Sequence, residues 1–65
     1  MSSATHVRNV QVRNTEDATD VRTVEITKDD EGHFFAKEGN GFVEIPDDSD
    51  TSIADLVRDN GYEVV

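Results

Sequence analysis

The chain has 65 residues and a formal net charge of −9, from 15 acidic and six basic side chains. It has no cysteine, so disulfides and thiolate-bound metals are excluded as sources of stability. No apolar run reaches the length of a signal-peptide core or a membrane span, and we expect a cytoplasmic protein. Residues 1–6 are expected to form a flexible tail, and residues 7–65 a single small domain.

The acidic excess restricts the partners that the chain can bind. Phosphate binding rests on clustered Lys and Arg, so we expect neither direct nucleic-acid binding nor attachment to an anionic membrane. Abundant Asp with only two lysines, Lys28 and Lys37, resembles the composition of proteins from halophiles that accumulate salt in the cytoplasm. In molar salt the screening length falls to about 3 Å, which largely removes the repulsion between like charges.

Alternating valines predict the first strand, over residues 7–13. Val10 and Val12 alternate with polar side chains, whereas Val7 does not fit this period. Residues 14–20 contain no large apolar side chain and predict a loop.

The second and third strands are predicted at residues 21–28 and 33–38, joined by a turn over residues 29–32. A three-residue loop that ends in a left-handed glycine places Asp29 opposite His33. The cross-strand pairs that follow are Ile26–Ala36 and Glu25–Lys37.

The sequence Gly39-Asn40-Gly41 predicts the next turn, before a fourth strand at residues 42–45. Asn-Gly is the preferred pair of a two-residue type I′ turn, so we place Asn40 and Gly41 at its centre. The expected cross-strand pairs are Glu38–Val43, Lys37–Glu44 and Ala36–Ile45. Glu25, Lys37 and Glu44 would then lie side by side across three strands.

These registers separate the two faces of the sheet. The inner face is expected to form the core and carries Val24, Ile26, Phe34, Ala36, Val43 and Ile45. The outer face carries Thr23, Glu25, Thr27, His33, Phe35, Lys37, Phe42 and Glu44. Two interpretations follow for its aromatic side chains: either the first strand or a second copy covers Phe35 and Phe42, or both form a partner-binding patch with an acidic rim.

One helix is predicted over residues 47–61. Asp50, Thr51 or Ser52 can serve as its N-cap, and Ser52 with Asp55 has the spacing of a capping box. The apolar stripe that faces the sheet consists of Ile53, Leu56 and Val57.

The helix is expected to end at Asn60-Gly61, and residues 62–65 to form a short final strand. The fold class is therefore α+β, with a small antiparallel sheet in β-β-β-β-α-β order and one helix packed on one face.

The search for catalytic chemistry indicates a protein that is not an enzyme. No serine lies in a G-x-S-x-G setting, and the aspartates before the helix do not fit an EF-hand loop. We expect no catalytic residue, no cofactor and no metal site. His33 could act as an acid, a base or a metal ligand only if Asp29 or Glu31 converges on it.

The segment TVEITKDDEGHFFAKE, residues 23–38, resembles the opening hairpin of HicB-type antitoxins, in which a strand, an acidic turn with glycine and an aromatic-rich strand recur. It covers about a quarter of the chain. The family's G-x-T-x-x-E-A motif is absent, and DTSIADL stands in its place, so no family is assigned. The resemblance implies an acidic module that binds a basic partner protein.

The sequence thus predicts a small acidic protein–protein interaction domain, with a homodimer through the outer sheet face as one form. The expected partner-binding residues are His33, Phe35, Lys37 and Phe42. The alternative is an antitoxin-like or DNA-mimicking regulatory module that neutralises a basic partner protein. Its surface would consist of Asp47, Asp48, Asp50, Asp55 and Asp59.

Overall fold

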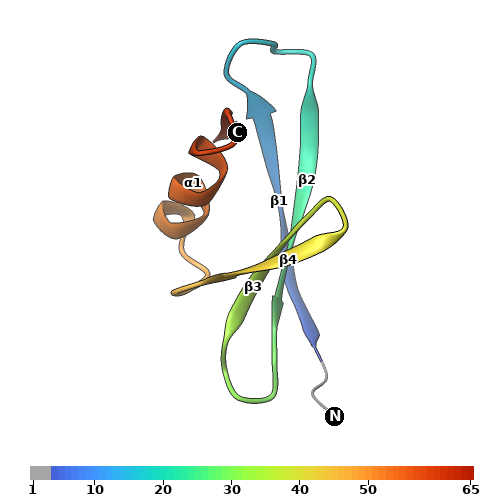
Figure 1. The fold of residues 1–65 in the computed structure, drawn as a ribbon, viewed down its shortest axis with the longest axis vertical. Coiled ribbons are helices and arrows are strands. Elements are labelled where there is room, and N and C mark those ends of the chain that lie inside the picture. The colour runs from blue at the N-terminus through green and yellow to red at the C-terminus, as the bar shows by residue number, and fades with distance from the viewer. Residues whose placement is uncertain (1–3) are drawn as a thin grey trace.

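The computed structural model describes residues 4–65, which form five strands and one helix (Figure 1). The elements in chain order are β1 (Thr5–Asn14), β2 (Val21–Lys28), β3 (Phe34–Glu38), β4 (Gly41–Ile45), α1 (Asp50–Arg58) and β5 (Tyr62–Val64). This β-β-β-β-α-β order confirms the predicted α+β class. No helix within the described part of the chain is long and apolar enough to cross a membrane.

All strands belong to one antiparallel sheet with the order β4-β3-β2-β1-β5. The sheet is strongly curled, so β4 crosses in front of β1 and β2 in Figure 1, while α1 lies to one side of them. The molecule is elongated, with extents of 39 × 21 × 17 Å.

Strand β1 is longer than the predicted strand at residues 7–13, because Thr5, His6 and Asn14 also belong to it. It thus includes two residues of the expected tail at residues 1–6, of which the first three lie outside the described residues. Its register with β2 shifts between His6 and Arg8, which is the place where Val7 interrupts the apolar alternation. Since β1 pairs edge to edge with β2 and β5, it extends the sheet and does not form a second layer over the outer face.

The β2–β3 hairpin has the predicted register. The Asp29 N–H donates to the His33 carbonyl at 2.9 Å, and Gly32 has a φ of 90°. The pairs Ile26–Ala36 and Glu25–Lys37 are both present.

The predicted β3–β4 register is wrong by two residues. The observed pairs are Phe34–Ile45, Phe35–Glu44, Ala36–Val43, Lys37–Phe42 and Glu38–Gly41. Gly39 and Asn40 therefore form the turn, and the left-handed residue is Gly39, with a φ of 57°. A glycine adopts this conformation without the steric cost that Asn40 would incur in a type I′ turn. The shift keeps the side chains of Phe42, Val43, Glu44 and Ile45 on their predicted faces but removes Glu44 from the predicted Glu25–Lys37–Glu44 row.

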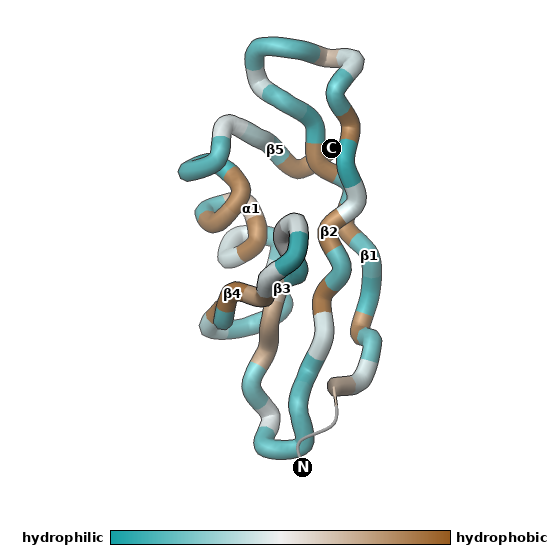
Figure 2. Tube along the Cα trace, turned by 45° about the vertical axis from the view of Figure 1, so that its right-hand side comes forward, coloured by the Kyte–Doolittle hydropathy of each residue, from teal (hydrophilic) through white to brown (hydrophobic). Residues whose placement is uncertain are grey.

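The core lies between the inner sheet face and α1. Its buried apolar residues are Val10, Val12, Val24, Ile26, Ala36, Ile45, Ile53 and Val57. Phe34 and Leu56 are partly buried against it, whereas Val43, which we expected in the core, is 39% exposed. Ile45, at the end of β4, is buried, whereas Val43, two residues nearer the turn, is not. Figure 2 shows hydrophobic segments along β1, β2, β4 and α1.

Both ends of α1, Asp50–Arg58, lie inside the predicted range of 47–61. The N-cap is Ser49, whose side chain accepts the Ser52 N–H at 3.2 Å, and not Asp50, Thr51 or Ser52. Ser49 has an extended backbone, as an N-cap requires, and the helix begins at the next residue. The predicted left-handed residue after the helix is confirmed at Gly61, with a φ of 84°.

Candidate functional site

The β3–β4 hairpin brings three of the four predicted partner-binding residues together. Lys37 lies directly opposite Phe42, and Phe35 lies one pair further along, opposite Glu44. Alternation along both strands places these four side chains on the outer face. We call Phe35, Lys37, Phe42 and Glu44 the hairpin surface.

Phe42 is the most exposed aromatic residue of this surface. It is 56% exposed, whereas Phe35 is half-buried beside Thr27, its cross-strand neighbour on β2. Val43 is exposed on the other face of the same strand. Strand β4 therefore presents apolar side chains to solvent on both faces.

The backbone of β4 adds to this surface. Within residues 4–65, β4 is the last strand of the sheet and has a strand neighbour on one side only. The outward backbone N–H and C=O groups of such an edge can pair with a strand from another chain. Phe42 and Val43 flank the edge, so a bound strand would contact both of them.

The charges around Lys37 differ from the predicted row. Glu44 lies opposite Phe35, and the Glu25 carboxylate is 2.9 Å from Nδ1 of His6. Lys37 is exposed and its direct neighbour on β4 is an aromatic ring. The hairpin surface thus combines two aromatic rings with one cation, Lys37, and one carboxylate, Glu44, and the Glu25–Lys37 cross-strand pair remains beside it.

His33, the fourth predicted residue, does not belong to this surface. It lies in the β2–β3 turn, four residues before Lys37, which corresponds to about 13 Å along a strand. Its Nδ1 is 3.4 Å from Asp29 Oδ2 and 3.9 Å from Glu31 Oε2. Both carboxylates named in the sequence analysis therefore do converge on His33.

The orientation of Asp29 is fixed by the turn. Its Oδ1 accepts the N–H of His33 at 2.8 Å and the N–H of Glu31 at 2.9 Å. These bonds, first the one from His33, lower the pKa of the Asp29 carboxyl because they stabilise its charged form. Oδ2 is directed at the imidazole.

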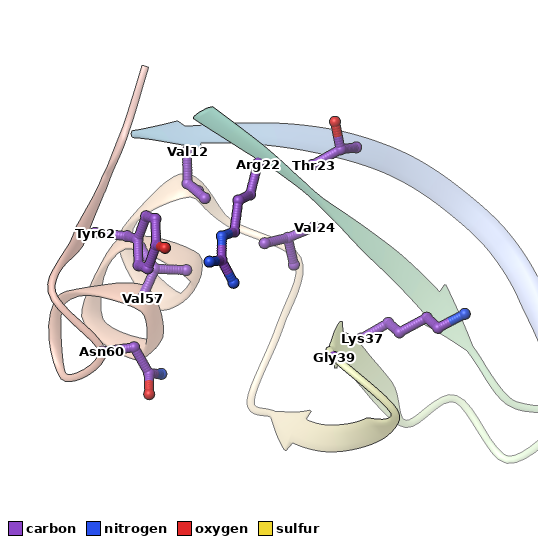
Figure 3. Close-up of a pocket in the computed structure, with 9 residues that line it drawn as sticks. All are labelled: Val12, Arg22, Thr23, Val24, Lys37, Gly39, Val57, Asn60 and Tyr62. Atoms are coloured by element: carbon purple, nitrogen blue, oxygen red, sulfur yellow. The ribbon is translucent and has the colours of Figure 1, made fainter. Parts of the chain in front are cut away.

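A hollow of about 340 Å³ opens on the inner face, between the β3–β4 turn and the C-terminal end of α1. Its lining includes Val12, Arg22, Val24, Gly39, Val57 and Tyr62. In Figure 3 the Arg22 guanidinium points into the hollow, whereas the Lys37 ammonium points away from it.

Arg22 is held by Asp20 and Tyr62. Its Nε is 3.2 Å from Asp20 Oδ1, and its guanidinium carbon lies 5.2 Å from the centre of the Tyr62 ring. Sequence reasoning missed this group, because only the pairing of β1 with β5 brings Tyr62 next to residues 20–22. No local pattern signals that contact. Since the guanidinium is already paired, we assign no ligand to the hollow.

Three of the five carboxylates proposed for an acidic surface make contacts within the chain. Asp50 is 2.8 Å from Arg8, and Asp55 is 2.7 Å from Arg58. Asp47 Oδ1 accepts the backbone N–H of Ser49 at 2.9 Å and the hydroxyl of Ser52 at 2.8 Å. The Ser49 side chain first, and then these two bonds, lower the pKa of the Asp47 carboxyl.

Comparison with known proteins identifies no relative whose functional residues could be assigned to this chain. The site is therefore defined by the geometry of this chain. No family model matches it, and no curated protein and no solved structure shows significant similarity to it.

Proposed function

We propose that this chain is a small, acidic, non-enzymatic protein–protein interaction domain that contacts its partner through the hairpin surface. The observation that carries the proposal is Phe42, which is 56% exposed beside Lys37 on an edge strand. Aromatic residues are enriched at the centres of protein interfaces, where their large apolar area leaves water. A chain of 65 residues has little apolar area to leave unburied.

The partner is a second copy of the chain or a different protein that supplies a strand and an apolar side chain. Strand addition at β4 would provide backbone hydrogen bonds, and Phe42 would provide buried area. Two copies with a net charge of −9 each repel one another in dilute buffer. Self-association is therefore expected in molar salt, where this repulsion is screened.

The test compares Phe42→Ala with Val65→Ala by sedimentation equilibrium in 2 M KCl (about 3 Å screening length or less). Val65 is 67% exposed and follows β5, at the opposite edge of the sheet, so it is the matched control. We expect the wild-type chain and Val65→Ala to associate as concentration rises, and Phe42→Ala to remain monomeric with an unchanged far-UV CD spectrum.

Phe35→Ala combined with Phe42→Ala extends the test to the half-buried ring. Loss of the folded CD spectrum in this double variant would assign Phe35 to the core and not to the interface. Equal association of the wild-type chain and Phe42→Ala would contradict the role of the hairpin surface in self-association.

The alternative proposal is an antitoxin-like or DNA-mimicking module whose acidic side binds a basic protein. The net charge of −9 supports it, and Asp59, on the exposed end of α1, belongs to the surface involved. Such binding rests on charge attraction and must weaken steeply as salt rises. Association that persists in molar salt and depends on Phe42 would favour the hairpin surface instead.

A further inference from the structure

The β2–β3 turn, at the bottom of Figure 1, gathers three side chains that carry metal-binding atoms. Asp29, just after β2, and His33, just before β3, close the three-residue loop, and Glu31 lies at its centre. One donor atom from each of Asp29, Glu31 and His33 lies within 4.8 Å of the other two.

These separations match those around a single bound ion. With metal–ligand distances near 2.1 Å, two donors in a tetrahedral site are about 3.4 Å apart. His33 Nδ1 is 3.4 Å from Asp29 Oδ2 and 3.9 Å from Glu31 Oε2. The Glu31 side chain is 75% exposed, so it can move toward the other two donors, which all lie within 4.8 Å of one another.

The site is partly organised before an ion binds. The Asp29 side chain is only 17% exposed, and two backbone N–H groups hold its Oδ1. Hydrogen bonds of this kind orient a metal ligand and raise the affinity of the site. Lys28, at the end of β2, places its ammonium 5.4 Å from the centre of the Phe34 ring.

The donor set selects the class of ion. One imidazole nitrogen and two carboxylate oxygens suit Zn²⁺ and its neighbours, whereas Ca²⁺ and Mg²⁺ are bound by oxygen ligands. We propose that Asp29, Glu31 and His33 bind one zinc-type divalent transition-metal ion, with water in the open position. The ion would fasten the turn across its two strands and offset the charge of three consecutive carboxylates, at residues 29–31.

The inference is independent of the proposed function, because the turn lies at the opposite end of β3 from Phe42. The test titrates the full chain with ZnCl₂, using calorimetry for affinity and ¹H–¹⁵N NMR for location. We expect one Zn²⁺ per chain and chemical-shift changes centred on residues 29–33. His33→Gln and Asp29→Asn should each weaken binding about tenfold or more.

Asp30→Asn is the matched control, because it removes one exposed carboxylate from the same loop without removing a proposed ligand. It should keep most of the affinity, and Mg²⁺ should not reproduce the effect of Zn²⁺. Glu31→Gln provides a second ligand variant if Asp29→Asn disturbs the turn. The proposal is overturned by absence of binding at millimolar Zn²⁺, by equal losses in Asp30→Asn and His33→Gln, or by equal responses to Mg²⁺ and Zn²⁺.

Discussion

The Tyr62 hydroxyl donates a hydrogen bond of 2.6 Å to Asp20 Oδ2 and is the largest cause that lowers the pKa of Asp20 below its ordinary value of 3.8. The same bond raises the pKa of Tyr62 above 10.0. A lowered carboxyl pKa contributes stability that is complete above pH 3.8 and is lost as the pH falls through the folded-state value. The contribution of Tyr62 is complete below pH 10.0 and is lost as the pH rises through its raised pKa.

Tyr62→Phe should therefore raise the pKa of Asp20 toward 3.8 and reduce the amount of stability that is lost when the pH falls below 3.8. Carboxyl ¹³C NMR titration measures this directly. Asp47 is the internal control, because its pKa is lowered by Ser49 and Ser52 instead. If the pKa of Asp20 were equal in the wild-type chain and in Tyr62→Phe, the assigned role of the hydroxyl would be wrong.

Substitutions of the two glycines in the β3–β4 hairpin distinguish the observed register from the predicted one. Gly39 has a φ of 57°, whereas Gly41 does not adopt a left-handed conformation, and an added Cβ meets no atom within 4 Å at either position. Gly39→Ala should cost about 1 kcal/mol of unfolding free energy, because an alanine is strained in that conformation. Gly41→Ala should be nearly neutral, since alanine restricts the unfolded chain and fits the folded one.

Urea denaturation of both variants measures the difference. A larger loss for Gly41→Ala than for Gly39→Ala would favour a type I′ turn centred on Asn40-Gly41 and contradict the observed register.

Local turn chemistry was sufficient to predict the β2–β3 register. A three-residue loop both places Asp29 opposite His33 and puts Gly32 at the left-handed position. It was not sufficient for the β3–β4 hairpin, where Gly39-Asn40 and Asn40-Gly41 are both acceptable two-residue loops. Both loops leave Phe42 on the outer face, so the faces were predicted correctly although the cross-strand pairs were not. A shift of two residues preserves the alternation of side chains.

Contacts between segments that are distant in the chain could not be predicted from the sequence. The place of β1 between β2 and β5 depends on which strand edges are free, and no residue pattern records that. The same pairing brings Tyr62 to Arg22 and His6 to Glu25. Acid–base or metal chemistry at His33 requires a nearby carboxylate from Asp29 or Glu31. Only the side-chain positions show that both carboxylates lie next to His33.

The whole molecule carries a net charge of −9 on 65 residues, which opposes the compact state at low ionic strength. Each surface ion pair, such as Arg13–Glu63 at 2.7 Å, contributes little to the free energy of unfolding. Screening of these pairs by salt therefore costs little stability. The free energy of unfolding should therefore rise between about 0.05 M and 2 M KCl, as the screening length shortens.

Urea denaturation at each salt concentration tests this expectation. The variant Asp30→Asn with Asp59→Asn removes two negative charges at exposed positions and should show a shallower dependence on salt. Stability that is flat or that falls with KCl would contradict the view that self-repulsion limits this fold.

The most direct test of the hairpin surface is a ¹H–¹⁵N NMR dilution series of the wild-type chain in 2 M KCl (a screening length of about 3 Å or less). The proposal predicts concentration-dependent shifts or line broadening at the amides of β3 and β4, centred on Phe42 and Val43. The amides of α1 should not change. Changes that concentrate on α1 and the preceding acidic loop, or spectra that are identical at all concentrations, would contradict self-association through the hairpin surface.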